Sequence, residues 1–93
     1  MSSDLDGQVA LVTGATRGIG RAIALRLAAT GATEIGTATS DEGARSIAAA
    51  LAEAGHKGTG MRLDVTDAAQ VDTVLAAVVS QFGQVSILVN NAG

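Results

Sequence analysis

One short stretch constrains this chain more than any other, and it reads Thr13-Gly14-Ala15-Thr16-Arg17-Gly18-Ile19-Gly20. The apolar run at residues 9–12 precedes it, and residues 21–27 follow it with helical spacing. A strand, a glycine turn and a helix are therefore predicted in that order. Glycines let the backbone turn tightly and approach a ligand, and a helix N-terminus offers unpaired N–H groups and the positive end of a dipole. The stretch predicts a cradle for a pyrophosphate.

Strands and helices are expected to alternate along the whole chain. Strands are predicted at residues 9–12, 34–39, 61–65 and 86–90, with a polar, glycine-rich turn at residues 56–60. The alternation β-α-β-α-β-α-β builds a parallel sheet with helices on both faces, through right-handed crossovers. Residues 1–93 are therefore predicted to form the N-terminal part of one α/β domain, which is expected to be incomplete.

The three helices have recognisable ends and apolar faces. Glycines are expected to stop them, at Gly31, Gly55 and Gly83. The expected N-terminal caps are Ser40 or Asp41 for the second helix and Thr66 or Asp67 for the third. The apolar periodicity predicts these buried residues in the first and third helices: Ile19, Ile23, Leu27, Val71, Val74, Leu75, Val78, Val79 and Phe82.

Composition excludes several functional classes. The chain has a net charge of −3 with six scattered basic residues, so neither nucleic acid nor an anionic membrane is an expected partner. It has no cysteine for a disulfide, a thiolate metal site or a thiol nucleophile, and His56 has no cluster of ligands around it, so no metal site is expected. No apolar run approaches the ~20 residues of a membrane helix, and residues 1–8 do not resemble a signal peptide. A cytoplasmic location is expected.

Four segments together resemble a known family. They are the T-G-x-x-x-G-I-G turn at residues 13–20, the sequence G-T-A-T-S at residues 36–40, the pair Asp64-Val65, and the sequence N-N-A-G at residues 90–93. Over nearly its whole length the chain resembles the N-terminal part of a short-chain dehydrogenase/reductase, most similar to the 3-oxoacyl-[acyl-carrier-protein] reductases. The resemblance implies a Rossmann-type parallel sheet, here reduced to four strands in the order 3-2-1-4.

The resemblance also implies NADP(H) as the cofactor. NAD-binding proteins of this kind place a carboxylate at the end of the second strand, where it would repel a 2′-phosphate. This chain has Thr39 and Ser40 there, and the nearby Asp41 is explained as a helix-opening residue. In the family pattern Thr39 bonds the 2′-phosphate and Arg17 supplies a positive charge; a solvated loop charge is the alternative for Arg17. NADPH is therefore expected to be preferred over NADH.

Further cofactor-binding residues follow from the same motifs. They are expected to be Gly14, Ala15, Thr16, Gly18, Ile19 and Gly20 of the turn, together with Asp64, Val65 and Asn91. Two interpretations of Asp64 stay open, since it could meet the adenine amino group or cap the turn that follows it. The resemblance implies that Asn91 contacts the ribose. Asn90 and Thr13 are expected to be structural, with Thr13 holding the first and fourth strands together.

Catalysis is not predicted from these residues. Reduction of a ketone by hydride needs a proton donor beside the carbonyl oxygen. The family uses a Tyr-x-x-x-Lys pair with a Ser and an Asn, whereas this sequence has no tyrosine and Lys57 as its one lysine, so no catalytic residue is assigned. The family reaction reduces an acyl-carrier-protein-linked 3-oxoacyl thioester to the 3-hydroxyacyl form in fatty acid biosynthesis. The alternatives are a nucleotide-binding fragment without activity and a part of a reductase for another carbonyl substrate.

The fourth strand is expected to be an unpaired edge. The chain reaches the fourth of the seven strands that the family pattern implies, and an exposed apolar edge invites strand pairing. We expect this edge to pair with the remainder of the polypeptide or with a second copy of the chain. The resemblance implies a homo-oligomer for the complete enzyme.

Overall fold

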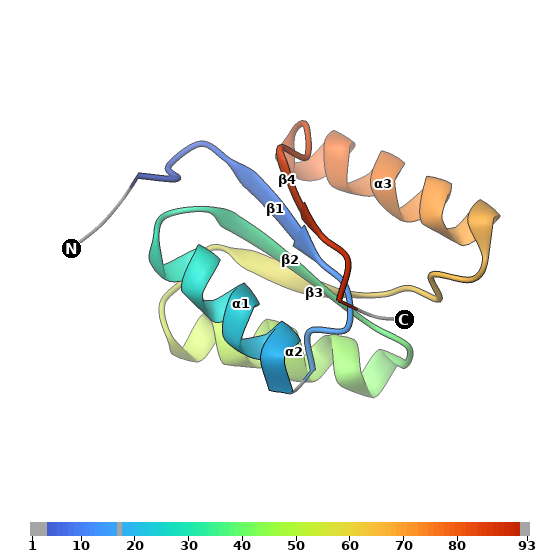
Figure 1. Ribbon diagram of the computed structural model, residues 1–93, viewed down its shortest axis with the longest axis horizontal. Helices are drawn as coiled ribbons and strands as arrows, with labels where there is room; N and C mark the ends of the chain where they lie inside the picture. Colours follow the sequence, from blue (N-terminus) through green and yellow to red (C-terminus); the bar gives the residue numbers. More distant parts are fainter. Residues whose placement is uncertain (1–3, 17, 92–93) are drawn as a thin grey trace.

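Strands and helices alternate through the described part of the chain. The computed structural model describes residues 4–16 and 18–91. Within them lie β1 (Val9–Val12), α1 (Gly18–Ala29), β2 (Thr33–Ala38), α2 (Asp41–Glu53), β3 (Gly58–Arg62), α3 (Ala68–Phe82) and β4 (Ile87–Val89). The strands pair in parallel in the order β3-β2-β1-β4, and α1 and α2 cover one face of the sheet while α3 covers the other (Figure 1). The predicted α/β fold and strand order are confirmed.

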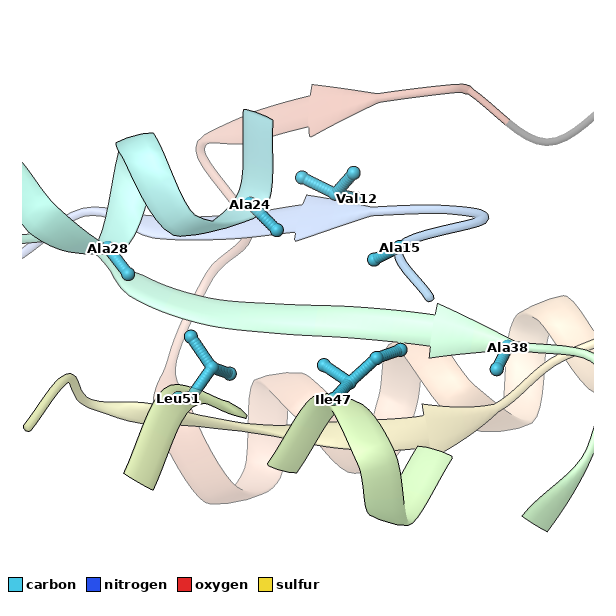
Figure 2. Packing of buried hydrophobic residues seen from close by; sticks show 7 residues of the cluster. All are labelled: Val12, Ala15, Ala24, Ala28, Ala38, Ile47 and Leu51. Carbon is cyan, nitrogen blue, oxygen red and sulfur yellow. The ribbon is translucent and has the colours of Figure 1, made fainter. Parts of the chain in front are cut away.

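Each face of the sheet carries its own apolar core. On the α1 and α2 face, Ile47 and Leu51 of α2 reach toward the sheet and join Ala24 and Ala28 of α1 (Figure 2). On the opposite face, Val74 and Val78 of α3 are buried in a cluster that also contains Leu11, Ile35 and Leu63. Because side chains alternate between the faces of a strand, each central strand contributes to both cores. The central strands consequently bury apolar side chains on both sides.

Glycines inside β2 and β3 let α2 lie directly on the sheet. A methyl group built on Gly36 would stand 2.7 Å from Cγ2 of Ile47 and 3.0 Å from Cβ of Ala15. One built on Gly60 would overlap the carbonyl oxygen of Ala44. Glycine is a poor strand former by itself, so its place in these strands is explained by the close approach of the helix.

The predicted bounds of the third strand were wrong. The strand covers Gly58–Arg62, whereas residues 61–65 were predicted as strand and residues 56–60 as a turn. Gly58 and Gly60 pair with Glu34 and Gly36 of β2, so these glycines serve close packing and not a turn. Leu63 continues the pairing by donating its N–H to the Ala38 carbonyl at 2.8 Å. The bounds of β2 and β4 differ from the predictions by one residue at each end.

The helix ends follow the predictions, with the open alternatives now decided. The side chain of Ser40 accepts from the Gly43 N–H at 3.0 Å, and that of Asp67 accepts from the Gln70 N–H at 3.2 Å, so these two residues are the caps. The expected stops all have the left-handed backbone that favours glycine, namely Gly31, Gly55 and Gly83. No helix in the described ranges is both long enough and apolar enough to span a membrane.

Two residues of the predicted helix faces lie outside the core. Ile19 is 74% exposed and Val79 is 40% exposed. In α1 the buried line runs through Gly20, Ala24 and Ala28, so the sheet contact is made by small residues one position around from Ile19. Ile23 and Leu27 pack at the edge of that contact. The periodicity located the helix correctly but favoured the larger side chains over the alanines that pack closest.

Glu34 is a carboxylic acid inside the sheet. Its side chain is fully buried, and neither carboxyl oxygen has a hydrogen-bond partner in the described residues. In register it stands between Ala10 of β1 and Gly58 of β3. Burial raises the pKa of Glu34 from 4.5 to about 8, because the charged form loses its hydration. The folded state therefore holds the acid protonated at neutral pH.

The buried acid predicts that the protein loses stability as the pH rises. The pKa in the folded state exceeds the unfolded value, so the folded state binds the proton more tightly, and stability falls between pH 4.5 and about 8. Glu34→Met keeps the length of the side chain and removes the acid. We expect it to raise the free energy of unfolding at pH 8 by more than about 1 kcal/mol, with a smaller gain at pH 5.

Denaturant unfolding at both pH values measures this effect. The matched control is Glu53→Met, which replaces an exposed acid at the end of α2 and should leave the pH dependence unchanged. Equal pH dependence in the Glu34→Met variant and the parent protein would contradict the assignment.

Candidate functional site

The three glycines of the turn are required for two different local reasons. Gly14 and Gly18 both have φ of +63°, a conformation that L side chains rarely adopt. Gly20 is required by space, since a methyl group there would overlap the Gly14 carbonyl oxygen and the Nδ2 atom of Asn91. Between them, Ala15 donates its N–H to the Thr37 carbonyl at 3.0 Å. The turn is therefore fixed against the ends of β1, β2 and β4.

Thr13 joins the glycine turn to the segment after β4. Its hydroxyl donates to Oδ1 of Asn90 at 3.2 Å and accepts the N–H of Asn91 at 2.9 Å, while its own N–H donates to the Val89 carbonyl at 3.0 Å. The predicted structural roles of Thr13 and Asn90 are confirmed. Asn91 also donates from Nδ2 to the Gly14 carbonyl at 3.1 Å, which holds the turn in place. Its predicted contact with a ribose stays a prediction.

The turn also contacts the segment between β2 and α2. A methyl group on Gly43, in the first turn of α2, would lie 2.7 Å from Cβ of Ala38 and 2.9 Å from Cγ2 of Thr16. Thr39 follows Ala38, is exposed, and lines one hollow together with Gly14 and Thr16. Thr39 therefore lies beside the glycine turn, at the same edge of the sheet.

Asp64 stabilises the turn that leads into α3. Its Oδ1 atom accepts the hydroxyl of Thr66 at 2.6 Å and the N–H of Thr66 at 3.0 Å. These bonds lower the pKa of Asp64, the side-chain bond most strongly, so the carboxylate is ionised at neutral pH. The turn-capping interpretation of Asp64 is confirmed. The backbone N–H of Asp64 donates to Oε1 of Gln70, a contact that no sequence signal indicated.

Several polar residues of the glycine turn, of the end of β2 and of the segment after β3 line one hollow at the carboxyl edge of the sheet. It has a volume of about 270 Å³ and is lined by Gly14, Thr16, Ala38, Thr39, Leu63, Asp64, Val65 and Thr66. Ligands of open α/β sheets bind at this edge, outside the carboxyl ends of the strands. The hollow offers backbone and hydroxyl groups for a polar ligand, and Val65 offers an apolar surface.

The other predicted site residues have different positions. Ala15 is 2% exposed and its methyl group belongs to the core, so its side chain is not presented to a ligand. Gly18 and Ile19 are exposed at the start of α1, while Gly20 is buried behind them. Arg17 lies outside the described residues. The described ranges contain no group of three or more His, Cys, Asp or Glu residues placed to hold a metal ion.

Comparisons with known proteins relate the sequence to one family. Residues 8–93 match the family model of the short chain dehydrogenases. The chain is 56% identical over 90 residues to the 3-oxoacyl-[acyl-carrier-protein] reductase FabG of Escherichia coli K12, which covers 97% of this chain and 36% of the relative. The FabG reductases of Haemophilus influenzae and Pseudomonas aeruginosa are 54% and 53% identical over 89 residues, each covering 96% of this chain and 36% of the relative. The chain thus spans about a third of the length of these relatives.

Removal of the Thr13 hydroxyl should loosen the join between β1 and β4. Thr13→Val keeps the shape of the side chain but leaves Asn90 and Asn91 without their partner atom. We expect the free energy of unfolding to fall by roughly 1 kcal/mol. The control is Thr73→Val, which deletes an exposed hydroxyl bonded to the Ala69 carbonyl in α3. Denaturant unfolding of both variants measures the difference, and equal losses would contradict the assigned role of Thr13.

Proposed function

Because the chain belongs to the short chain dehydrogenase family, we propose that its 93 residues form the NADP(H)-binding part of an oxidoreductase similar to the 3-oxoacyl-[acyl-carrier-protein] reductases. The observation that carries the proposal is the convergence of the glycine turn, Thr39 and the Asp64-Val65 pair at one edge of the sheet. These segments are far apart in the sequence. Their meeting at the carboxyl edge supports a shared ligand.

Each part of the cofactor has a candidate partner in this arrangement. The pyrophosphate is assigned to the turn between Gly14 and Gly20, where the glycines leave the backbone open to a ligand and α1 begins. The adenine is assigned to the hollow beside Val65, and the carboxylate of Asp64, which also caps the turn before α3, would accept from the adenine amino group. Asn91 is assigned to the ribose, and Ile19 offers its exposed apolar side chain beside the turn.

The preference for NADP(H) is assigned to the end of β2. Thr39 presents a hydroxyl where a carboxylate would select NAD, and a hydroxyl can donate to a 2′-phosphate. Arg17 is proposed to add the positive charge that a phosphate accepts in bidentate form. The bound cofactor would supply hydride, while these residues bind and orient it.

The proposed reaction of the whole protein follows the activity for which the relatives are named, the reduction of a 3-oxoacyl group on an acyl carrier protein. By the family resemblance, this reaction gives the 3-hydroxyacyl form in fatty acid biosynthesis. The sequence of 93 residues contains no tyrosine, so the proton donor of the family pattern is not supplied by these residues. Binding of the cofactor without reduction of a thioester is the alternative outcome. The cytoplasmic location stays a prediction.

We also propose that β4 is covered by further polypeptide. In the described sheet β4 pairs with β1 on one side, and Leu88 is 64% exposed. A hollow of about 190 Å³ next to it is lined mainly by apolar residues of β1, α3, β4 and the segment between β3 and α3. An edge of this kind is completed by an added strand, either from the rest of the polypeptide or from a second copy, which is consistent with a homo-oligomeric enzyme.

A carboxylate at position 39 tests the proposed cofactor preference. The parent protein should bind NADPH more tightly than NADH in a fluorescence titration of the reduced nicotinamide. Thr39→Asp should weaken NADPH binding about tenfold and leave NADH binding the same or stronger, because the new carboxylate repels the 2′-phosphate and accepts from ribose hydroxyls.

The control variant is Thr73→Asp, which adds the same charge on the exposed face of α3. It should change neither affinity by more than a small factor. A parent protein that binds neither nucleotide would contradict the proposed function, and one that binds both equally would contradict the NADP preference alone.

A further inference from the structure

An arginine and an aspartate meet beside the Thr39 segment. Arg62 ends β3 and pairs in register with Ala38, the residue before Thr39. Asp41 opens α2, two residues after Thr39. The Nη1 atom of Arg62 lies 3.9 Å from Oδ2 of Asp41, and the two side chains are 60% and 70% exposed. Together with Arg45 they line a hollow of about 420 Å³.

This position matters because Asp41 is a carboxylate near the proposed 2′-phosphate position. A negative charge there opposes a second negative charge, in the same way that a carboxylate at the end of the second strand selects NAD. Ser40 is the residue that caps α2, and Asp41 stands in the first turn of the helix, where the helix dipole favours a negative charge. Within the described ranges, Arg62 is the cation that stands within ion-pair distance of Asp41. Its charge offsets the repulsion that Asp41 would otherwise exert.

The contact with Asp41 does not use the hydrogen-bond donors of the Arg62 guanidinium. At 3.9 Å its contact with Asp41 is a charge pair and not a hydrogen bond, and an exposed pair of this length holds its partners weakly. The planar fork of an arginine matches two oxygens of a phosphate. A doubly charged phosphate next to the pair would therefore compete well for Arg62.

We propose that Arg62 is a specificity-determining residue for the 2′-phosphate of NADP(H). Its positive charge offsets the negative charge of Asp41, and its guanidinium donates to the phosphate. Arg62 does this from the end of β3, so its role does not depend on the glycine turn. The inference rests on the proposed function, because it assumes that the adenosine end of the cofactor binds between Thr39 and Val65. It adds a residue that none of the sequence motifs indicated, since Arg62 belongs to a strand and not to a conspicuous turn.

Calorimetric titration with two adenosine nucleotides tests the proposal without any measurement of activity. The probes are adenosine 2′,5′-bisphosphate and adenosine 5′-monophosphate, which differ by the 2′-phosphate. The parent protein should bind the bisphosphate more tightly. Arg62→Gln should weaken bisphosphate binding about three- to fivefold and leave monophosphate binding unchanged, as expected for one exposed charged contact. Arg62→Lys keeps the charge but not the fork, and it should give an intermediate loss.

Two further variants separate local from general charge effects. Arg26→Gln removes an equal charge from the last turn of α1, which lies away from the carboxyl ends of the strands. It should leave both affinities unchanged. Asp41→Asn in the Arg62→Gln background should recover part of the lost affinity, because the repelling carboxylate is gone. Thermal unfolding followed by circular dichroism checks that every variant is folded.

The outcomes distinguish the inference from the function on which it rests. A parent protein that prefers the bisphosphate, with Arg62→Gln indistinguishable from it, would overturn the role of Arg62 and leave the proposed function standing. Equal losses for both nucleotides in a folded Arg62→Gln variant would also overturn that role. A parent protein that binds neither nucleotide, or does not discriminate between them, would overturn the proposed cofactor preference and this inference with it.

Discussion

The arrangement of this molecule depends on the close approach of three backbone segments at the carboxyl edge of the sheet. Gly20 in the first turn of α1 lies against the Gly14 carbonyl and the side chain of Asn91, with no room for a methyl group. Thr13 and Asn91 then join the end of β1 to the segment after β4 by hydrogen bonds. A larger residue at position 20 would force these segments apart. The shape of the candidate site thus follows from the smallest side chain in it.

The same requirement for small residues shapes the body of the fold. Alanines of α1 and glycines of β2 and β3 let both helices lie close to the sheet, so a core of modest aliphatic side chains suffices. Glu34 is the exception, a buried acid without a partner in the described residues. The strand that carries it, β2, pairs on both sides and is buried along nearly its whole length.

Much of this could be predicted from the sequence, and the failures have physical causes. The glycine turn was predictable because its spacing has few other uses, and the capping residues because their side chains bond to local N–H groups. The third strand was misplaced because Gly58 and Gly60 resemble turn residues, while their actual reason is contact with β2 and α2. The exposure of Ile19 and the pairing of Arg62 with Asp41 depend on tertiary placement, which local periodicity does not contain.

The central claim is that a nicotinamide nucleotide binds across the carboxyl edge of this sheet. Amide chemical-shift mapping by NMR during titration with NADPH tests it most directly, because each described glycine and threonine reports its own position. The predicted result is a set of shifts at Gly14, Thr16, Thr39 and Val65, with none at Gly31 and Gly55 at the far ends of α1 and α2. Shifts confined to the opposite edge, or no shifts at saturating nucleotide, would contradict the claim.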